Sequence, residues 1–232
     1  DVQVQTFTAE LNADVGIGKL TLLGNYIETD NQSRSYGPGF LFQQDDTAEQ
    51  SSFEARLGNE SELLRWVAGL YYFQEDQSTK FWVDQGFLFN QTGSSMDALD
   101  DETLAAFTEL TFNLTDRLHL TGGVRYTTEE KDVDGVVFTR QPQAVATCAA
   151  LVGAPPVFIG TVSNQVPFAA TNGAGLVYPF PYCQDTITGN RDWNDTSWKV
   201  GLSYEVTDDS MTYLTVNRGF KAGGFFAAGD HA

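Results

Sequence analysis

Apolar and polar residues alternate along most of the chain with a period of two, which is the period of a β-strand. The alternating segments are rich in Thr, Val, Tyr and Phe, which favour strands. Eight strands are expected, at residues 3–15, 19–28, 51–58, 64–75, 103–114, 118–130, 196–206 and 211–218. No segment keeps a 3.6-residue period over the length of a helix, so the pattern predicts an all-β fold.

The connections between these segments alternate in length. Short turns are expected at residues 16–18, 59–63, 115–117 and 207–210, and long loops at 29–50, 76–102 and 131–195. Two hairpins resemble each other, AFTELTFNLTDRLHLTGGVRY and SWKVGLSYEVTDDSMTYLTVNRGF, and in each an Asp (Asp116 or Asp208) can bond the backbone of its own turn. Short turns at one end and long loops at the other are typical of an antiparallel up-and-down meander in an outer-membrane β-barrel.

Sorting the strand residues by parity separates two faces. One face carries no charged residue in seven of the strands; the last strand fits either way, because Tyr213 and Thr215 alternate with Leu214 and Val216. The other face carries charged residues: Glu10, Asp14, Glu54, Arg56, Glu109, Arg125, Lys199 and Glu205. One such charge at the middle of a bilayer would cost about 2–4 kcal/mol, so this segregation predicts contact with outer-membrane lipid on the uncharged face.

Aromatic residues gather near both ends of the expected strands. Those near the short turns are Trp66, Phe112, Tyr204 and Tyr213, and those near the long loops are Tyr26, Tyr72, Tyr126 and Trp198. Two aromatic girdles separated by a strand length fit the two interfaces of a membrane. A soluble β-sandwich could use the same residues as its core, so it stays open as an alternative.

Charge and motifs exclude several function classes. The 232 residues include 31 Asp and Glu against 13 Lys and Arg, a net charge of −18, so no basic surface is available for nucleic acid. Neither a P-loop nor a GxSxG nucleophile motif occurs, so no catalytic residue and no cofactor is expected. Acidic clusters at residues 100–102 and 129–130 match no known calcium-loop spacing and are interpreted as a solvated rim rather than a metal site.

The two cysteines, Cys148 and Cys183, lie in one Pro- and Gly-rich segment. They are interpreted as a single disulfide formed in an oxidising compartment, which would stabilise the chain by roughly 4 kcal/mol, and two unpaired thiols are the alternative. The histidines His119 and His231 are far from them in sequence, and no spacing typical of zinc ligands occurs.

One expected loop contains an aromatic segment with Phe81, Trp82, Phe87 and Phe89. Exposed aromatic rings beside polar groups suit stacking on a flat or cyclic ligand, although they could equally pack the loops against each other. Acidic residues in the first long loop would favour cationic or metal-bearing ligands.

Three segments in order, LLRWVAGLYYFQED, LTDRLHLTGGVRYTTEEKD and YLTVNRGFKAGGFF, resemble the barrel of TonB-dependent outer-membrane receptors. The most specific parts are GVRYTTEEKD at residues 123–132 and NRGFKAGGFF at residues 217–226. The resemblance implies a Gram-negative outer-membrane protein that takes up scarce ligands, most often ferric siderophores and in other members cobalamin, haem or saccharides. It also implies a plug domain inside the barrel and an inner-membrane TonB complex that supplies energy through the region N-terminal to the plug.

Eight strands are fewer than the 22 of such a barrel, so residues 1–232 are expected to form one domain, an internal slice of it without the plug and the closing strand. The slice should be an open curved antiparallel sheet. Its charged face is then expected to meet the plug through five residues: Glu10, Glu54, Arg56, Glu109 and Arg125.

Two other functions stay open at this point. A complete eight-stranded outer-membrane barrel would act as a structural or adhesive protein. A secreted β-sandwich would bind carbohydrate through the aromatic segment and would be monomeric in water without detergent.

Overall fold

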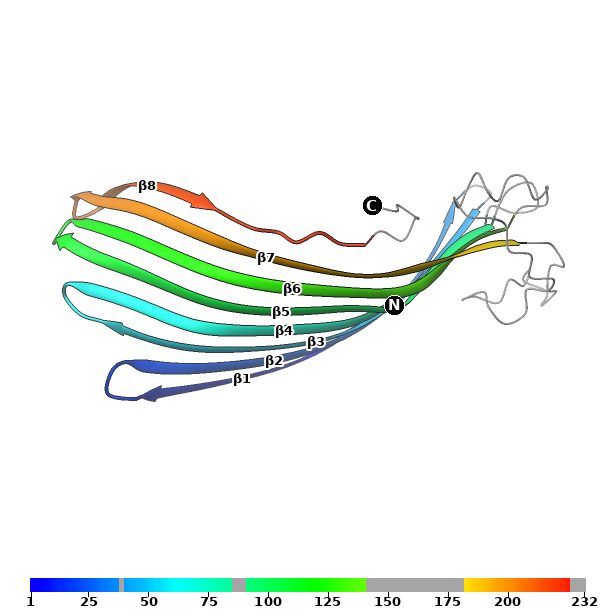
Figure 1. The fold of residues 1–232 in the computed structure, drawn as a ribbon, viewed down its shortest axis with the longest axis horizontal. Coiled ribbons are helices and arrows are strands. Elements are labelled where there is room, and N and C mark those ends of the chain that lie inside the picture. Colours follow the sequence, from blue (N-terminus) through cyan, green and yellow to red (C-terminus); the bar gives the residue numbers. More distant parts are fainter. Residues whose placement is uncertain (38–39, 85–90, 141–181, 226–232) are drawn as a thin grey trace.

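The computed structural model describes residues 1–37, 40–84, 91–140 and 182–225. These residues form one eight-stranded antiparallel sheet in which every strand pairs with its neighbours in sequence (Figure 1). The strands are β1 (Val2–Asp14), β2 (Lys19–Gly37), β3 (Phe40–Glu60), β4 (Leu64–Asp84), β5 (Gln91–Thr115), β6 (Leu118–Arg140), β7 (Tyr182–Thr207) and β8 (Ser210–Arg218). The expected all-β meander is therefore confirmed, and β1 and β8 form the two edges of an open curved sheet.

The four short turns lie together at one end of the sheet, as expected (Figure 1). In the first turn the N–H of Val15 donates to the carbonyl of Gly18 at 3.0 Å, and Gly16 has a φ of 80°, which is in the left-handed region that glycine adopts most easily. In the turns of the two similar hairpins, backbone N–H groups donate to the hydroxyls of Thr115 and Thr207. This differs from the expected role of Asp208, which instead pairs with Arg117 of the other turn at 3.2 Å.

At the other end, the expected strand limits were wrong. The described residues of the segments expected as loops at 29–50, 76–102 and 131–195 all belong to strands: β2 runs to Gly37, β4 to Asp84 and β6 to Arg140. Regular alternation of apolar and polar residues stops in these extensions, because residues 28–35 are all polar whereas residues 81–83 and 136–138 are apolar runs. The strands nevertheless continue, because backbone hydrogen bonds between neighbours do not depend on the side chains.

The sheet has two faces of different character. The uncharged parity forms the apolar face, where Phe7 is 68% exposed, Leu70 is 60% exposed and Leu202 is 44% exposed. Pairing settles the ambiguous last strand, because Leu214 lies opposite Leu202 and Val216 lies opposite Val200, so both join the apolar face. A soluble protein rarely leaves so wide an apolar surface open to water.

The opposite surface, the polar face, carries the charged residues that parity separated from the uncharged ones. Five of the best-buried side chains of the described residues lie on it: Thr21, Ala105, Thr111, Thr127 and Val133. Crowding on one face is what curvature produces on the concave side of a sheet, so the polar face is the inner one. The described residues form no second sheet packed against it, so the β-sandwich alternative was wrong.

The part of the chain that the structure describes contains no helix with the length and apolar character needed to cross a bilayer.

Candidate functional site

All five of the expected plug-facing residues lie on the polar face. They come from four strands: Glu10 from β1, Glu54 and Arg56 from β3, Glu109 from β5 and Arg125 from β6. Their shared orientation follows from parity and from the cross-strand register, which aligns Glu10 with Leu23 and Leu23 with Glu54. The structure brings some of these residues into contact with each other and gives the others partners that the alternation did not reveal.

Arg125 lies against two aromatic rings. Its guanidinium carbon lies 5.1 Å from the ring centroid of Tyr71 and 5.8 Å from that of Phe107, both distances at which a cation and an aromatic face attract. Its Nε donates to the Thr127 hydroxyl at 3.2 Å. Phe107 can lie flat because its neighbour across the ladder is Gly69, where a β-carbon would come within 2.6 Å of the ring.

Glu109 is paired with Lys199, which is two strands away. The Lys199 Nζ lies 2.6 Å from a Glu109 carboxylate oxygen. Gly123 stands between them in register, and a β-carbon there would come within 3.3 Å of the Lys199 side chain. The glycine therefore leaves a path along which the lysine chain crosses β6 to reach the carboxylate.

The remaining expected residues have local partners. Arg56 lies 3.2 Å from the Glu54 carboxylate two residues before it on β3. Glu10 accepts a hydrogen bond of 2.5 Å from the side-chain amide of Asn12 on β1. These two interactions are within single strands, so they fix the side chains without tying strands together.

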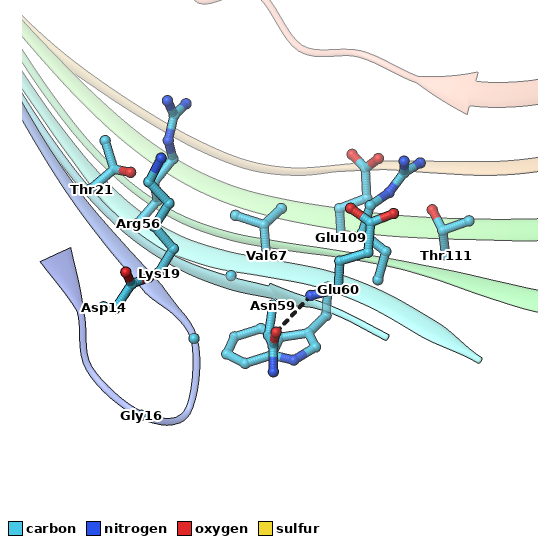
Figure 2. Close-up of a pocket in the computed structure, with 14 residues that line it drawn as sticks. Asp14, Gly16, Lys19, Thr21, Arg56, Asn59, Glu60, Val67, Glu109 and Thr111 are labelled. Atoms are coloured by element: carbon cyan, nitrogen blue, oxygen red, sulfur yellow. Dashed lines mark hydrogen bonds between the residues drawn. The ribbon is translucent and has the colours of Figure 1, made fainter. Parts of the chain in front are cut away.

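A hollow of about 640 Å³ lies on the polar face near the short turns (Figure 2). Figure 2 shows Lys19, Arg56 and Glu109 projecting from the same side of the sheet. The charged residues that line the hollow are Asp14, Lys19, Arg56, Glu60, Arg65 and Glu109. Acids and bases occur in equal number, so this surface offers ion-pair partners of both signs and not a pocket for one charged ligand.

A second charged group lies on the polar face in the outer extensions, and the alternation did not single it out. Lys131 contacts carboxylates of Asp101 at 2.7 Å and Glu129 at 2.8 Å. Partial burial opposes protonation, but the hydrogen bonds with Asp101 and Glu129 outweigh it and raise the pKa of Lys131 above its ordinary value. The acidic clusters at residues 100–102 and 129–130 were expected to be a solvated rim, and for Asp101 and Glu129 this was wrong, because their side chains are only 16% exposed. Lys131 was not predicted because it lies in a segment expected to be a loop. Extending the strand that ends near residue 130 would have placed Lys131 on the polar face.

The outward side of the same extensions carries a row of acids. Register places Glu28 opposite Glu49, Glu49 opposite Asp76, Asp76 opposite Asp100 and Asp100 opposite Asp132. Burial, then the charges of Asp76 and Asp132, raise the pKa of Asp100. Within the described ranges no group of three or more His, Cys, Asp or Glu side chains is arranged to hold a metal ion.

The expected loop aromatics are placed only in part. Phe81 belongs to strand β4, not to a loop, and is half-buried with its ring centroid 6.2 Å from that of Phe42. Trp82 follows it in β4, opposite Gln43, and Phe87 and Phe89 lie outside the described residues. The disulfide expected between Cys148 and Cys183 likewise falls outside what the structure describes, because Cys148 and the side chain of Cys183 are not included.

Comparison with known proteins gives the family. A family model described as the TonB dependent receptor-like β-barrel matches residues 1–230. Curated protein sequences gave no match. Among solved structures, the ferric yersiniabactin uptake receptor FyuA from Yersinia pestis has a TM-score of 0.60 and 16% identity, covering 92% of this chain and 27% of FyuA. The open form of the ferric-catecholate import receptor Fiu from E. coli K12 has a TM-score of 0.49 and 10% identity, covering 93% of this chain and 35% of Fiu.

The chain thus spans about a third or less of these receptors. Its open sheet matches part of the FyuA barrel. The separation of an apolar face from a polar inner face has the same explanation, since a barrel wall has lipid on one side and a polar interior on the other. The chain belongs to the TonB-dependent receptors, which are transporters of the Gram-negative outer membrane and not enzymes, and it represents part of their β-barrel.

Proposed function

We propose that residues 1–232 form one segment of the barrel wall of a receptor that imports ferric siderophores across the outer membrane. The energy for import would come from the TonB complex, acting through a region of the receptor outside these residues. The observation that carries the proposal is the division of one sheet into an uncharged apolar face and a polar face with cross-strand ion pairs. Such a sheet suits a wall between lipid and a polar interior.

The polar face would contact the plug domain of the same receptor through Glu10, Glu54, Arg56, Glu109 and Arg125. Arg125 is the most favourable of these contacts. Tyr71 and Phe107 fix its guanidinium, and among the described residues no carboxylate pairs with it. Its terminal nitrogens could therefore hold a plug carboxylate in a two-point contact, which is the strong geometry for arginine.

The choice of a ferric siderophore rests on two supports. FyuA, the structure with a TM-score of 0.60, is a ferric yersiniabactin uptake receptor. The outer extensions carry many acids, and such a rim favours approach of cationic or metal-bearing ligands over anionic ones. Phe81, Trp82, Phe87 and Phe89 would contact the ligand, and a disulfide between Cys148 and Cys183 would restrain the segment between β6 and β7.

Uptake of radioactive iron by cells that express the full-length receptor tests the ligand. The strain should lack its own siderophore receptors, and it should be offered a panel of ferric siderophores and haem in parallel. We expect TonB-dependent accumulation with at least one ferric siderophore. Accumulation with haem alone, or none that depends on TonB, would show that the proposed ligand class is wrong.

Charge reversal tests the plug contacts in the same cells. Arg125→Glu and Glu109→Lys should lower the uptake rate at unchanged receptor abundance, because each places a like charge against its plug partner. Glu130→Lys is the matched control, since Glu130 is on β6 but on the outward side of the sheet. If all three variants import at the wild-type rate, these residues do not contact the plug.

A further inference from the structure

Strand β8 ends well before its partner. The last pair between them joins Trp198 to Arg218, whereas β7 continues outward to Tyr182. From Tyr182 to Ser197, β7 has β6 on one side and, among the described residues, no paired strand on the other. An unpaired strand edge of this length tends to acquire a partner.

The residues after β8 already follow this edge. Figure 1 shows the chain continuing beyond the arrow of β8 beside the outer part of β7. A β-carbon on Gly223 would lie 2.9 Å from the Trp193 ring, and one on Gly189 would lie 2.8 Å from the Phe225 ring. Counting outward from the pair of Trp198 with Arg218, continued pairing would place Gly223 opposite Trp193, and in the structure Gly223 already lies against the Trp193 ring.

The side chain of Arg218 occupies the first position that continued pairing would need. Its two terminal nitrogens donate to the Asp195 carboxylate at 2.5 and 2.7 Å, and one of them also donates to the Thr196 carbonyl at 2.7 Å. Alternate residues of an antiparallel strand point their backbone groups to the same side, so this carbonyl faces β8 as that of Trp198 does. In a longer ladder it would accept the N–H of Phe220.

The sequence after Arg218 is compatible with that longer ladder. On the polar face, Lys221 would lie opposite Asp195, which replaces one basic partner of this carboxylate with another. Opposite charges at directly paired positions stabilise a sheet. Gly223 would lie opposite Trp193, where a residue without a side chain leaves room for the large ring.

We propose that residues 219–225 are an extension of β8 that Arg218 holds off the edge of β7. The hairpin then has two forms. In the capped form, which the structure shows, Arg218 bonds Asp195 and Thr196. In the extended form, backbone groups of Phe220 and Ala222 pair with Thr196 and Asn194, Lys221 takes over Asp195, and the part of the β7 edge next to Trp198 is closed.

Amide hydrogen exchange in the full-length receptor, folded in lipid vesicles, tests this inference. In the wild type, residues 219–225 should exchange fast. Arg218→Gln should slow exchange at Phe220 and Ala222 by about tenfold or more, since removing the cap favours the ladder. Arg117→Gln is the matched control, because it breaks an exposed Arg–Asp pair of 3.2 Å at the other end of the same hairpin and should change nothing here.

A second variant separates ladder formation from any other cause of protection. Ala222→Pro in the Arg218→Gln background should restore fast exchange at Phe220, because proline has no N–H to pair with Asn194 and interrupts the ladder. The proposal is wrong if Arg218→Gln leaves exchange unchanged or speeds it, or if the wild type is already protected at these amides. Protection of Phe220 that survives Ala222→Pro would contradict it equally.

Discussion

At the scale of single residues, two glycines decide how the polar face is built. Gly69 makes room for the Phe107 ring that supports Arg125, and Gly123 makes room for the Lys199 chain that reaches Glu109. The alternation in the sequence predicts that these charged residues share a face. It does not predict their partners, because a partner across two strands depends on register, and register depends on turns and bulges that the alternation does not encode.

Gly69→Ala should destabilise the folded receptor by roughly 1–3 kcal/mol, the usual cost of overpacking. The new β-carbon would lie 2.6 Å from Phe107 and 2.8 Å from the backbone oxygen of Ala55, which cannot move aside easily. The urea midpoint of unfolding in lipid vesicles measures this. Gly122→Ala is the control, since a β-carbon there has no atom within 4 Å. An equal effect of both substitutions would contradict the packing argument.

Lys131→Met should destabilise by roughly 1–3 kcal/mol, because it leaves two half-buried carboxylates without the charged donor they share. Lys199→Met should cost at most about 1 kcal/mol, the range of exposed ion pairs, since Lys199 and Glu109 are 44% and 37% exposed. Both midpoints can be compared in one unfolding experiment. If Lys199→Met costs more than Lys131→Met, exposure does not decide the strength of these pairs.

The pH dependence of the Lys131 contribution follows from its raised pKa. A base whose folded pKa lies above the unfolded one stabilises fully below the unfolded value, near 10.5, and loses that stabilisation as the pH rises through the folded value. The wild type should therefore lose more stability than Lys131→Met between pH 10 and stronger alkali. Parallel curves for the two proteins in this range would rule out this contribution.

At the scale of strands, the sequence predicts the membrane-facing part of each element and fails beyond it. The eight strands and the four short turns are where alternation and turn residues place them. The outer ends of β2 to β7 were missed because apolar and polar residues no longer alternate there: residues 29–35 are all polar, whereas residues 40–42 and 81–83 are apolar runs. Backbone pairing with two neighbours maintains the strand there without any help from side-chain periodicity.

Asp100→Asn should stabilise the outer extensions by about 0.2–1 kcal/mol, the range for like charges on directly opposite residues. Burial and the charges of Asp76 and Asp132 raise the pKa of Asp100, so folding disfavours its ionised form. The wild type should therefore gain stability as the pH falls from the folded pKa toward the ordinary value of 3.8, and Asp100→Asn should lack that gain. Unfolding midpoints against pH measure it.

Asp134→Asn is the matched control for Asp100→Asn. Asp134 is on the same outward side of β6, but the residues opposite it are Ala98 and Thr188, which carry no charge. Its substitution should leave the midpoint nearly unchanged at every pH. A gain as large as that of Asp100→Asn would mean that net charge, and not the row of opposed acids, sets the stability.

At the scale of the whole molecule, the sheet is a wall with lipid on one side. The apolar face leaves side chains such as Phe7, Leu70 and Val200 at least half exposed, which is costly in water and favourable in a bilayer. On the polar face Glu109 pairs with Lys199 and Arg125 lies against aromatic rings, as suits a surface that faces another polar body. The two faces of one sheet thus have two different solvents.

The measurement that tests this most directly is accessibility along β7 in the full-length receptor folded in lipid vesicles. Single cysteines at residues 199–204, in a background with Cys148→Ser and Cys183→Ser, would each carry a nitroxide label. Oxygen, which concentrates in lipid, and a water-soluble nickel complex would serve as the two relaxing agents. Val200, Leu202 and Tyr204 should be accessible to oxygen, and Lys199, Gly201 and Ser203 should be shielded from it. Equal accessibility at all six positions, or the opposite alternation, would contradict the account.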